Sequence, residues 1–152
     1  MADLDLCYTP AVELAARIRD GNLNPVTVVE NALDRIKTVN AKLNCFCFVY
    51  PEESLELARE MEAEAKIGTF RGPMHGVPFA IKDLTPTKGK RTTLGSYAYE
   101  HWVPDHDAPI VEALKDAGGI MIGKTTTPEF AYSSFTESPL WGITRNPWKP
   151  ER

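Results

Sequence analysis

The sequence predicts an α/β fold in which helices flank a central mixed sheet. Helical patterns dominate residues 1–67, whereas short apolar strands and turns begin at residue 68. In this second part, a helical pattern over 108–117 is followed by Gly118-Gly119 and then by the apolar run 120–123. The order of helix, glycine turn and buried strand is typical of an α/β sheet. We therefore expect a helical amino-terminal region, 1–67, followed by an α/β core segment, 68–152.

Composition places the chain among ordinary globular proteins. Its 152 residues are 43% hydrophobic and 25% charged, which suits a single hydrophobic core. With a formal net charge of −4, the chain lacks the excess of basic residues that is typical of nucleic-acid binders, so we expect no nucleic-acid partner. No run approaches the roughly 18 consecutive apolar residues that a membrane helix needs, so we expect no membrane contact.

Cysteine usage and the amino terminus predict a cytoplasmic protein. The three cysteines, Cys7, Cys45 and Cys47, are an odd number without metal-ligand spacing, and we expect them to be reduced and buried. The opening Met-Ala-Asp-Leu-Asp-Leu combines neither a basic region nor an apolar run, so it does not form a secretory signal.

Three helices and a strand are expected in the first region. Thr9-Pro10 reads as an N-cap with proline at the first helical position, and Gly21 ends that helix. A second helix begins at Pro25 and has one apolar and one charged face. The aromatic run 44–50 predicts a strand, and a third helix follows over 51–66 with acidic residues in its first turn.

The second region is expected to surround a site. Residues 77–81 read as a buried strand after a glycine turn. The polar segment 85–95 contains Pro86 and Gly89 and predicts a loop. The segment 124–152 is rich in Thr, Ser, Pro and aromatic residues, and we expect it to be ordered and to pack against further structure.

Lys82 closes the apolar run 77–81 and is a candidate general base. Burial at the end of a strand disfavours the charged form of a lysine, and a neutral amine can accept a proton near neutrality. The local sequence alone favours a second interpretation, in which the stem lies along the sheet and the amine reaches Asp83 or water. Because successive strand residues point to opposite faces, Asp83 is expected to be structural.

An ordered series of segments resembles the amidase signature family. The segment ending in Gly-Val-Pro-Phe-Ala-Ile-Lys-Asp resembles the family's lysine segment, and the others follow in the family's order and at its separations. The segments are 72–83, 92–96, 103–108, 118–125, 127–131, 138–142 and 144–148. The resemblance covers essentially the whole chain and implies that residues 1–152 are the amino-terminal portion of a single amidase-signature domain.

The resemblance implies hydrolysis of a carboxamide to a carboxylate and an amine or ammonia, with no metal or organic cofactor. Members of the family use a Ser-Ser-Lys triad, in which the lysine, here Lys82, acts through a bridging serine held by a cis peptide bond. Ala131 and Ser133 match the segment beside the substrate. Ser133 is expected to bond to the bridging serine or the substrate, or to make a local turn bond. The resemblance also implies a small-molecule amide substrate and a homodimeric full-length enzyme.

The sequence departs from the family in one respect, because neither serine of the triad is present. The family carries them in and after a Gly-Gly-Ser-Ser-Gly-Gly loop, which residues 1–152 lack. By the family spacing, the bridging serine is expected a few residues beyond Arg152 and the nucleophile further along. The chain by itself is therefore expected to be inactive.

Two alternative functions stay open. The A subunit of a tRNA-dependent amidotransferase shares the same core, although Thr127-Pro128-Glu129 resembles general amidases and amidotransferase subunits usually show Asn-Met-Asp-Glu here. A non-catalytic binding module is the other alternative, and its uncovered sheet edges would be an aggregation hazard. His75, His101 and His106 lack the spacing of a zinc site, so we expect no metal.

Overall fold

The computed structural model describes residues 1–151 and contains two compact units. Unit 1 comprises residues 1–38, 50–79 and 113–122. Unit 2 comprises residues 39–49 and 80–112, and the chain from Gly123 onward.

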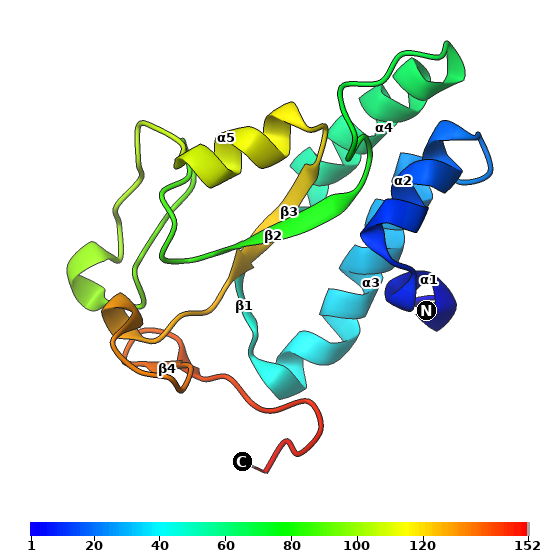
Figure 1. Cartoon of the computed structure of the whole chain (residues 1–152). Helices are drawn as coiled ribbons and strands as arrows, with labels where there is room; N and C mark the ends of the chain where they lie inside the picture. Colours follow the sequence, from blue (N-terminus) through cyan, green and yellow to red (C-terminus); the bar gives the residue numbers. More distant parts are fainter. Residues whose placement is uncertain (152) are drawn as a thin grey trace. The chain divides into compact units, whose positions relative to one another are not determined.

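The helices largely follow the sequence patterns (Figure 1). Helices α2, α3 and α4 span Ala11–Arg19, Pro25–Leu43 and Pro51–Lys66, and the last of these has the predicted bounds. Pro51 occupies the first turn of α4, where a missing N–H costs nothing. No helix in residues 1–151 combines the length and the apolar character required to cross a bilayer.

An additional short helix, α1 (Leu4–Tyr8), corrects one expectation. The sequence predicts Thr9 as the cap of the following helix, but it is the C-cap of α1, and its hydroxyl donates to the Asp5 carbonyl at 2.9 Å. Pro10 is the N-cap of α2 and makes no side-chain capping bond. The Asp3 carboxylate caps α1 by accepting from the backbone N–H groups of Asp5 and Leu6. The prediction failed because Thr-Pro also suits the end of one helix and the start of the next.

The core of unit 1 joins the first helices to the segment that leads into the sheet. Its buried side chains are Leu14, Ile18, Val28 and Val77, and Leu6, Ala15, Leu23 and Met74 pack against them. Leu14 and Ile18 lie on the apolar stripe of α2 and Val28 lies on that of α3, which is why the helical periodicity is visible in the sequence.

The imidazole of His75 stabilises the turn that follows α4. Its ring Nδ1 accepts from the Arg71 N–H at 3.1 Å, so the other nitrogen, Nε2, carries the hydrogen and donates to the Met61 carbonyl at 2.8 Å. Only 2% of His75 is exposed. Both ring nitrogens of His75 are therefore hydrogen-bonded to the backbone.

A three-stranded mixed sheet confirms the predicted fold class. Strands β1 (Phe46–Val49), β2 (Pro78–Lys82) and β3 (Ile120–Thr125) lie in the order β1-β3-β2. β1 is antiparallel to β3. The backbone bonds from Ile120 N–H to the Val77 carbonyl and from Asp83 N–H to the Thr125 carbonyl show that β2 and β3 run parallel. β3 is two residues longer than predicted and includes Lys124.

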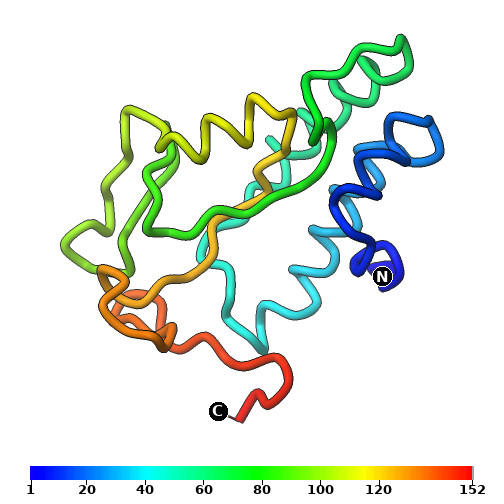
Figure 2. Tube along the Cα trace, viewed as in Figure 1, coloured from blue at the N-terminus to red at the C-terminus, as the bar shows by residue number. Residues whose placement is uncertain are grey.

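Unit 2 also contains the loop and the final segment that the sequence set apart. Residues 84–96 form no helix or strand, as predicted. The loop leads through a 3-10 turn, η1 (Tyr97–Tyr99), toward helix α5 (Pro109–Asp116). After β3 the chain forms η2 (Glu129–Ala131) and a short antiparallel hairpin of β4 (Glu137–Ser138) and β5 (Gly142–Ile143). These elements lie on the orange and red part of the trace in Figure 2.

Candidate active site

Lys82 is the last residue of β2, and its side chain is exposed. Ile81 and Asp83, its neighbours in sequence, are buried, with 6% and 0% exposure. The predicted alternation of Lys82 and Asp83 between the two faces is therefore present. The sequence predicted that Lys82 would be buried, but residues 1–151 leave its side chain exposed.

Lys124, on β3, is the desolvated lysine of unit 2. Its side chain is fully buried, and its Nζ donates to the Thr85 carbonyl at 3.0 Å and to the Thr92 hydroxyl. The Asp83 carboxylate lies 3.8 Å from Lys124 Nζ. Burial lowers the pKa of Lys124 to about 8, and the nearby Asp83 carboxylate opposes this shift. The only sequence signal for this residue was a lysine directly after the apolar run 120–123.

Asp83 is the centre of a buried polar cluster. Its carboxylate accepts from the Thr93 N–H at 3.0 Å, from the Thr93 hydroxyl, and from Trp141 Nε1–H at 3.2 Å. Trp141 Nε1 also lies 2.9 Å from the Thr93 hydroxyl oxygen. Together with the Lys124 ammonium, these donors satisfy a charge that would otherwise be costly to bury. Asp83 therefore has the structural role that the strand alternation predicted.

Cys47 lies beside this cluster. Its thiol donates to the Lys124 carbonyl, with 3.4 Å between sulfur and oxygen. Burial raises the pKa of the Cys47 thiol to about 12, and the Asp83 carboxylate adds to the rise. A thiol that keeps its proton is a poor nucleophile. Cys47, like Cys7 and Cys45, is half-buried, whereas the sequence predicted buried cysteines. All three cysteines are free.

An aromatic and cationic stack supports the indole of Trp141. The rings of Phe48 and Trp141 meet edge to face, with centroids 5.2 Å apart. The Arg91 guanidinium carbon lies 4.9 Å from the Phe48 ring centroid and 5.9 Å from that of Trp141. Such contacts favour one orientation of the indole, and therefore one direction for its N–H.

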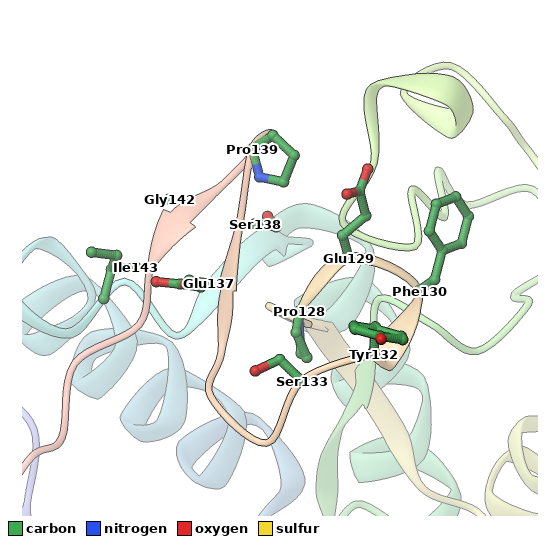
Figure 3. A pocket seen from close by; sticks show the side chains of 10 residues that line it. All are labelled: Pro128, Glu129, Phe130, Tyr132, Ser133, Glu137, Ser138, Pro139, Gly142 and Ile143. Carbon is green, nitrogen blue, oxygen red and sulfur yellow. The ribbon is translucent and has the colours of Figure 1, made fainter.

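A pocket of about 510 Å³ opens between η2 and the β4–β5 hairpin. Figure 3 shows the hairpin on one side of this pocket and the segment from Pro128 to Ser133 on the other. The volume falls within the range of small-molecule sites, which is about 300–1,000 Å³. The lining residues are Pro128, Glu129, Phe130, Tyr132, Ser133, Glu137, Ser138, Pro139, Gly142 and Ile143.

The structure places the two predicted substrate residues differently. Ser133 lines the pocket, and its Oγ accepts from the Phe135 N–H at 3.1 Å, which is a local turn bond. Ala131 is exposed and lies next to the pocket lining, with a positive φ of 56°. Phe130 also has a positive φ, of 50°. Two consecutive non-glycine residues in this conformation are uncommon, and nothing in the local sequence indicated them. Lys82 is not among the lining residues.

Metal ligation finds no support in the part of the chain that the structure describes. No group of three or more His, Cys, Asp or Glu side chains within residues 1–151 is arranged to hold an ion. His101 and His106 lie in the loop before α5, and their side chains are exposed.

These features define an α/β protein with a mixed sheet, a lysine at the end of β2 and a pocket in the segment after β3. The Amidase family model matches residues 27–152, and the chain belongs to this family.

Two curated relatives illustrate the range of the similarity. The chain is 41% identical over 148 residues to the A subunit of glutamyl-tRNA(Gln) amidotransferase from Acidothermus cellulolyticus, covering 97% of this chain and 29% of that protein. It is 40% identical over 141 residues to indoleacetamide hydrolase of Bradyrhizobium diazoefficiens, covering 93% of this chain and 27% of that protein. The chain thus spans less than a third of the length of either relative.

Solved structures show the same relationship. The native peptide amidase from Stenotrophomonas maltophilia superposes with a TM-score of 0.87 at 32% identity, covering 97% of this chain and 31% of that chain. The 6-aminohexanoate cyclic dimer hydrolase superposes with a TM-score of 0.84 at 30% identity, covering 100% of this chain and 30% of that chain.

Proposed function

We propose that residues 1–152 are the amino-terminal portion of an amidase that hydrolyses a carboxamide, with Lys82 as its catalytic base. The observation that carries the proposal is the family match over residues 27–152, which includes the Lys82–Asp83 pair at the end of β2. The hydrogen bonds from Thr93 and Trp141 to Asp83 also support the proposal. Asp83 follows Lys82 directly, and the side chain of a catalytic base must project from the sheet in a defined direction.

The proposed chemistry moves one proton in each direction. A neutral Lys82 amine takes the proton of a bridging serine, and that serine takes the proton of the nucleophilic serine as the latter attacks the amide carbonyl. The resulting Lys82 ammonium returns the proton through the same serine to the departing amine, and water then releases the carboxylate. No metal or organic cofactor takes part. Residues 1–152 lack the glycine-rich serine motif, so we propose that they do not turn over amides alone.

We assign the substrate side of this reaction to the segment around Ser133. Ser133 lines the pocket beside Phe130 and Tyr132, and Ala131 lies between these two residues in the sequence. A pocket with mostly apolar walls and a few hydroxyls suits a small-molecule amide. A cytoplasmic homodimer is proposed for the complete enzyme, and the three free cysteines support a reducing compartment.

Replacement of Lys82 tests the proposal. In the complete natural protein that contains residues 1–152, we expect Lys82→Ala to lower the acylation rate by several orders of magnitude and to leave the fold intact. Lys42→Ala is the matched control, because Lys42 is also exposed but lies in the last turn of α3. Single-turnover kinetics with a simple amide measure the effect, and near-normal turnover in Lys82→Ala would remove Lys82 from the mechanism.

A second candidate function is that of the A subunit in an amidotransferase. Relatives with that name share 40–41% identity with this chain, about the same as the indoleacetamide hydrolase. Purified complete protein distinguishes the two. Hydrolysis of simple amides by the protein alone supports the amidase, whereas activity that requires partner subunits and aminoacyl-tRNA supports the amidotransferase.

A further inference from the structure

We propose that Thr93 and Trp141 are positioning residues for Lys82 and act through the carboxylate of Asp83. The proposal rests on the function proposed above, in which Lys82 is the base. It concerns a polar clamp, defined here as the side chains of Asp83, Thr93, Lys124 and Trp141. Neither Thr93 nor Trp141 needs to touch a substrate in this role.

The backbone on either side of the Lys82–Asp83 peptide bond is held by hydrogen bonds. The Lys82 carbonyl accepts from the Thr85 N–H at 3.0 Å, and the Asp83 N–H donates to the Thr125 carbonyl at 2.8 Å. The next carbonyl, that of Asp83, accepts from the Leu94 N–H at 2.9 Å. The backbone from which the Lys82 side chain departs is therefore tied to β3 on one side and to the loop of Leu94 on the other.

The clamp then fixes the direction of the Asp83 side chain, and with it the opposite direction of Lys82. Thr93 donates from both its N–H and its hydroxyl, and Trp141 donates to the same carboxylate and lies within bonding distance of the Thr93 hydroxyl oxygen. Asp83 is 0% exposed, so water cannot replace a lost donor without a structural change. The loss of a donor therefore requires Asp83 to move, and a movement of the Asp83 backbone would rotate the adjacent Lys82.

Trp141 is also held in place by contacts other than its bond to Asp83. Its ring packs edge to face on Phe48, its backbone N–H donates to Ser138 Oγ at 3.0 Å, and its carbonyl accepts from Asn44 Nδ2 at 2.7 Å. A donor fixed in this way is preorganised for the carboxylate. Phenylalanine at this position would keep an aromatic ring against Phe48 and lose the indole N–H.

A matched pair of variants tests the proposal in the complete natural protein. Thr93→Val keeps the shape of the side chain and removes the hydroxyl, whereas Thr93→Ser keeps the hydroxyl and removes a methyl group. We expect Thr93→Val and Trp141→Phe to lower kcat by about tenfold or more, with KM within about twofold of wild type. Thr93→Ser is expected to retain most of the wild-type kcat. Equal activity of the Val and Ser variants would overturn the proposal.

A double-mutant cycle separates positioning from a general effect on the fold. In the Lys82→Ala background, Trp141→Phe and Thr93→Val should cause no further loss, because they act through Lys82. Equal losses in both backgrounds would overturn the positioning role and leave Lys82 as the base. Undiminished turnover of Lys82→Ala alone would instead remove the proposed function. Where the Lys82→Ala rate is below detection, or Trp141→Phe does not fold, the Thr93 pair decides.

Discussion

At the scale of single residues, strands β2 and β3 each carry one lysine, and the two lysines lie in opposite environments. Lys82 is exposed at the end of β2, whereas Lys124 is fully buried on β3 beside Asp83. Desolvation penalises an ammonium ion, and the pKa of Lys124 is lowered to about 8 for this reason. Protonation of the buried Lys124 is therefore linked to folding.

Lys124 should make the free energy of unfolding depend on pH. Its pKa is about 8 in the folded chain and has a reference value of 10.5, so between these values the unfolded state binds more protons. Stability contributed by this group therefore rises as the pH increases from about 8 to about 10.5, and it is constant below that window. Urea unfolding of wild type and Lys124→Met across this window measures the effect. We expect the wild-type curve to rise relative to the variant.

The comparison with Lys124→Met cancels the opposing contribution of Cys47. The raised pKa of the Cys47 thiol, about 12 against a reference of 9.0, lowers stability as the pH increases through that range in both proteins. Parallel curves for wild type and variant would contradict the assignment of a depressed pKa to Lys124. Below about pH 8 the variant is also expected to be less stable than wild type, because it leaves the buried Asp83 carboxylate without its cation.

At the scale of elements, the Gly118-Gly119 turn between α5 and β3 is closed by tight backbone packing. Gly118 has a φ of +86°, and a Cβ atom there would lie 2.9 Å from His75 Cα and 3.1 Å from His75 N. The turn is also bonded to Gly76, whose N–H donates to the Gly118 carbonyl at 3.0 Å. The glycine is required both by its conformation and by the close approach.

Alanine substitution separates these two requirements. Gly118→Ala should lower the free energy of unfolding by more than the roughly 1 kcal/mol that a positive φ alone costs an alanine. Gly89→Ala is the control, since Gly89 has a φ of +71° with nothing within 4 Å of a Cβ atom. Urea denaturation of both variants measures the difference. Equal losses would show that the chain around His75 relaxes without cost.

At the scale of the whole chain, exposed apolar side chains gather in the segment after β3. Phe130, Tyr132, Phe135, Ile143 and Trp148 are between 51% and 94% exposed. A second cavity of about 800 Å³ lies along the same segment, with Phe135 and Trp148 among its lining residues. Exposed apolar surface of this kind promotes association.

Self-association of the 152-residue chain should depend on this surface. We expect the double variant Phe135→Ser/Trp148→Ser to associate less than wild type, because it removes two large apolar side chains from one segment. Tyr8→Ser/Val12→Ser is the control, since Tyr8 and Val12 are 78% and 81% exposed in unit 1. Sedimentation velocity over a range of concentrations gives the comparison. An equal effect of both double variants would show that total exposed area, rather than this segment, governs association.

Elements whose signals are local could be predicted from the sequence. Helix α4 could be predicted to the residue because Pro51 and the acidic first turn mark its start and Gly68 follows its end. The strands β1, β2 and β3 were visible as short apolar runs, and the ordered motifs sufficed to predict the family. Periodicity and capping depend on neighbours within a few residues, so one chain is enough to detect them.

Which lysine is buried, and what surrounds it, could not be predicted from the sequence because both depend on long-range packing. The hydrogen bonds of the Asp83 cluster connect distant parts of the chain. The partners are separated by 10 positions in Thr93–Asp83, by 48 in Trp141–Thr93 and by 58 in Trp141–Asp83. No local sequence pattern encodes such pairings. The positive φ angles of Phe130 and Ala131 likewise depend on long-range partners, such as the bond from Phe130 N–H to the Leu94 carbonyl. Burial and hydrogen-bond partnership are properties of the packed chain, because desolvation depends on every group that surrounds a side chain and not on its sequence neighbours.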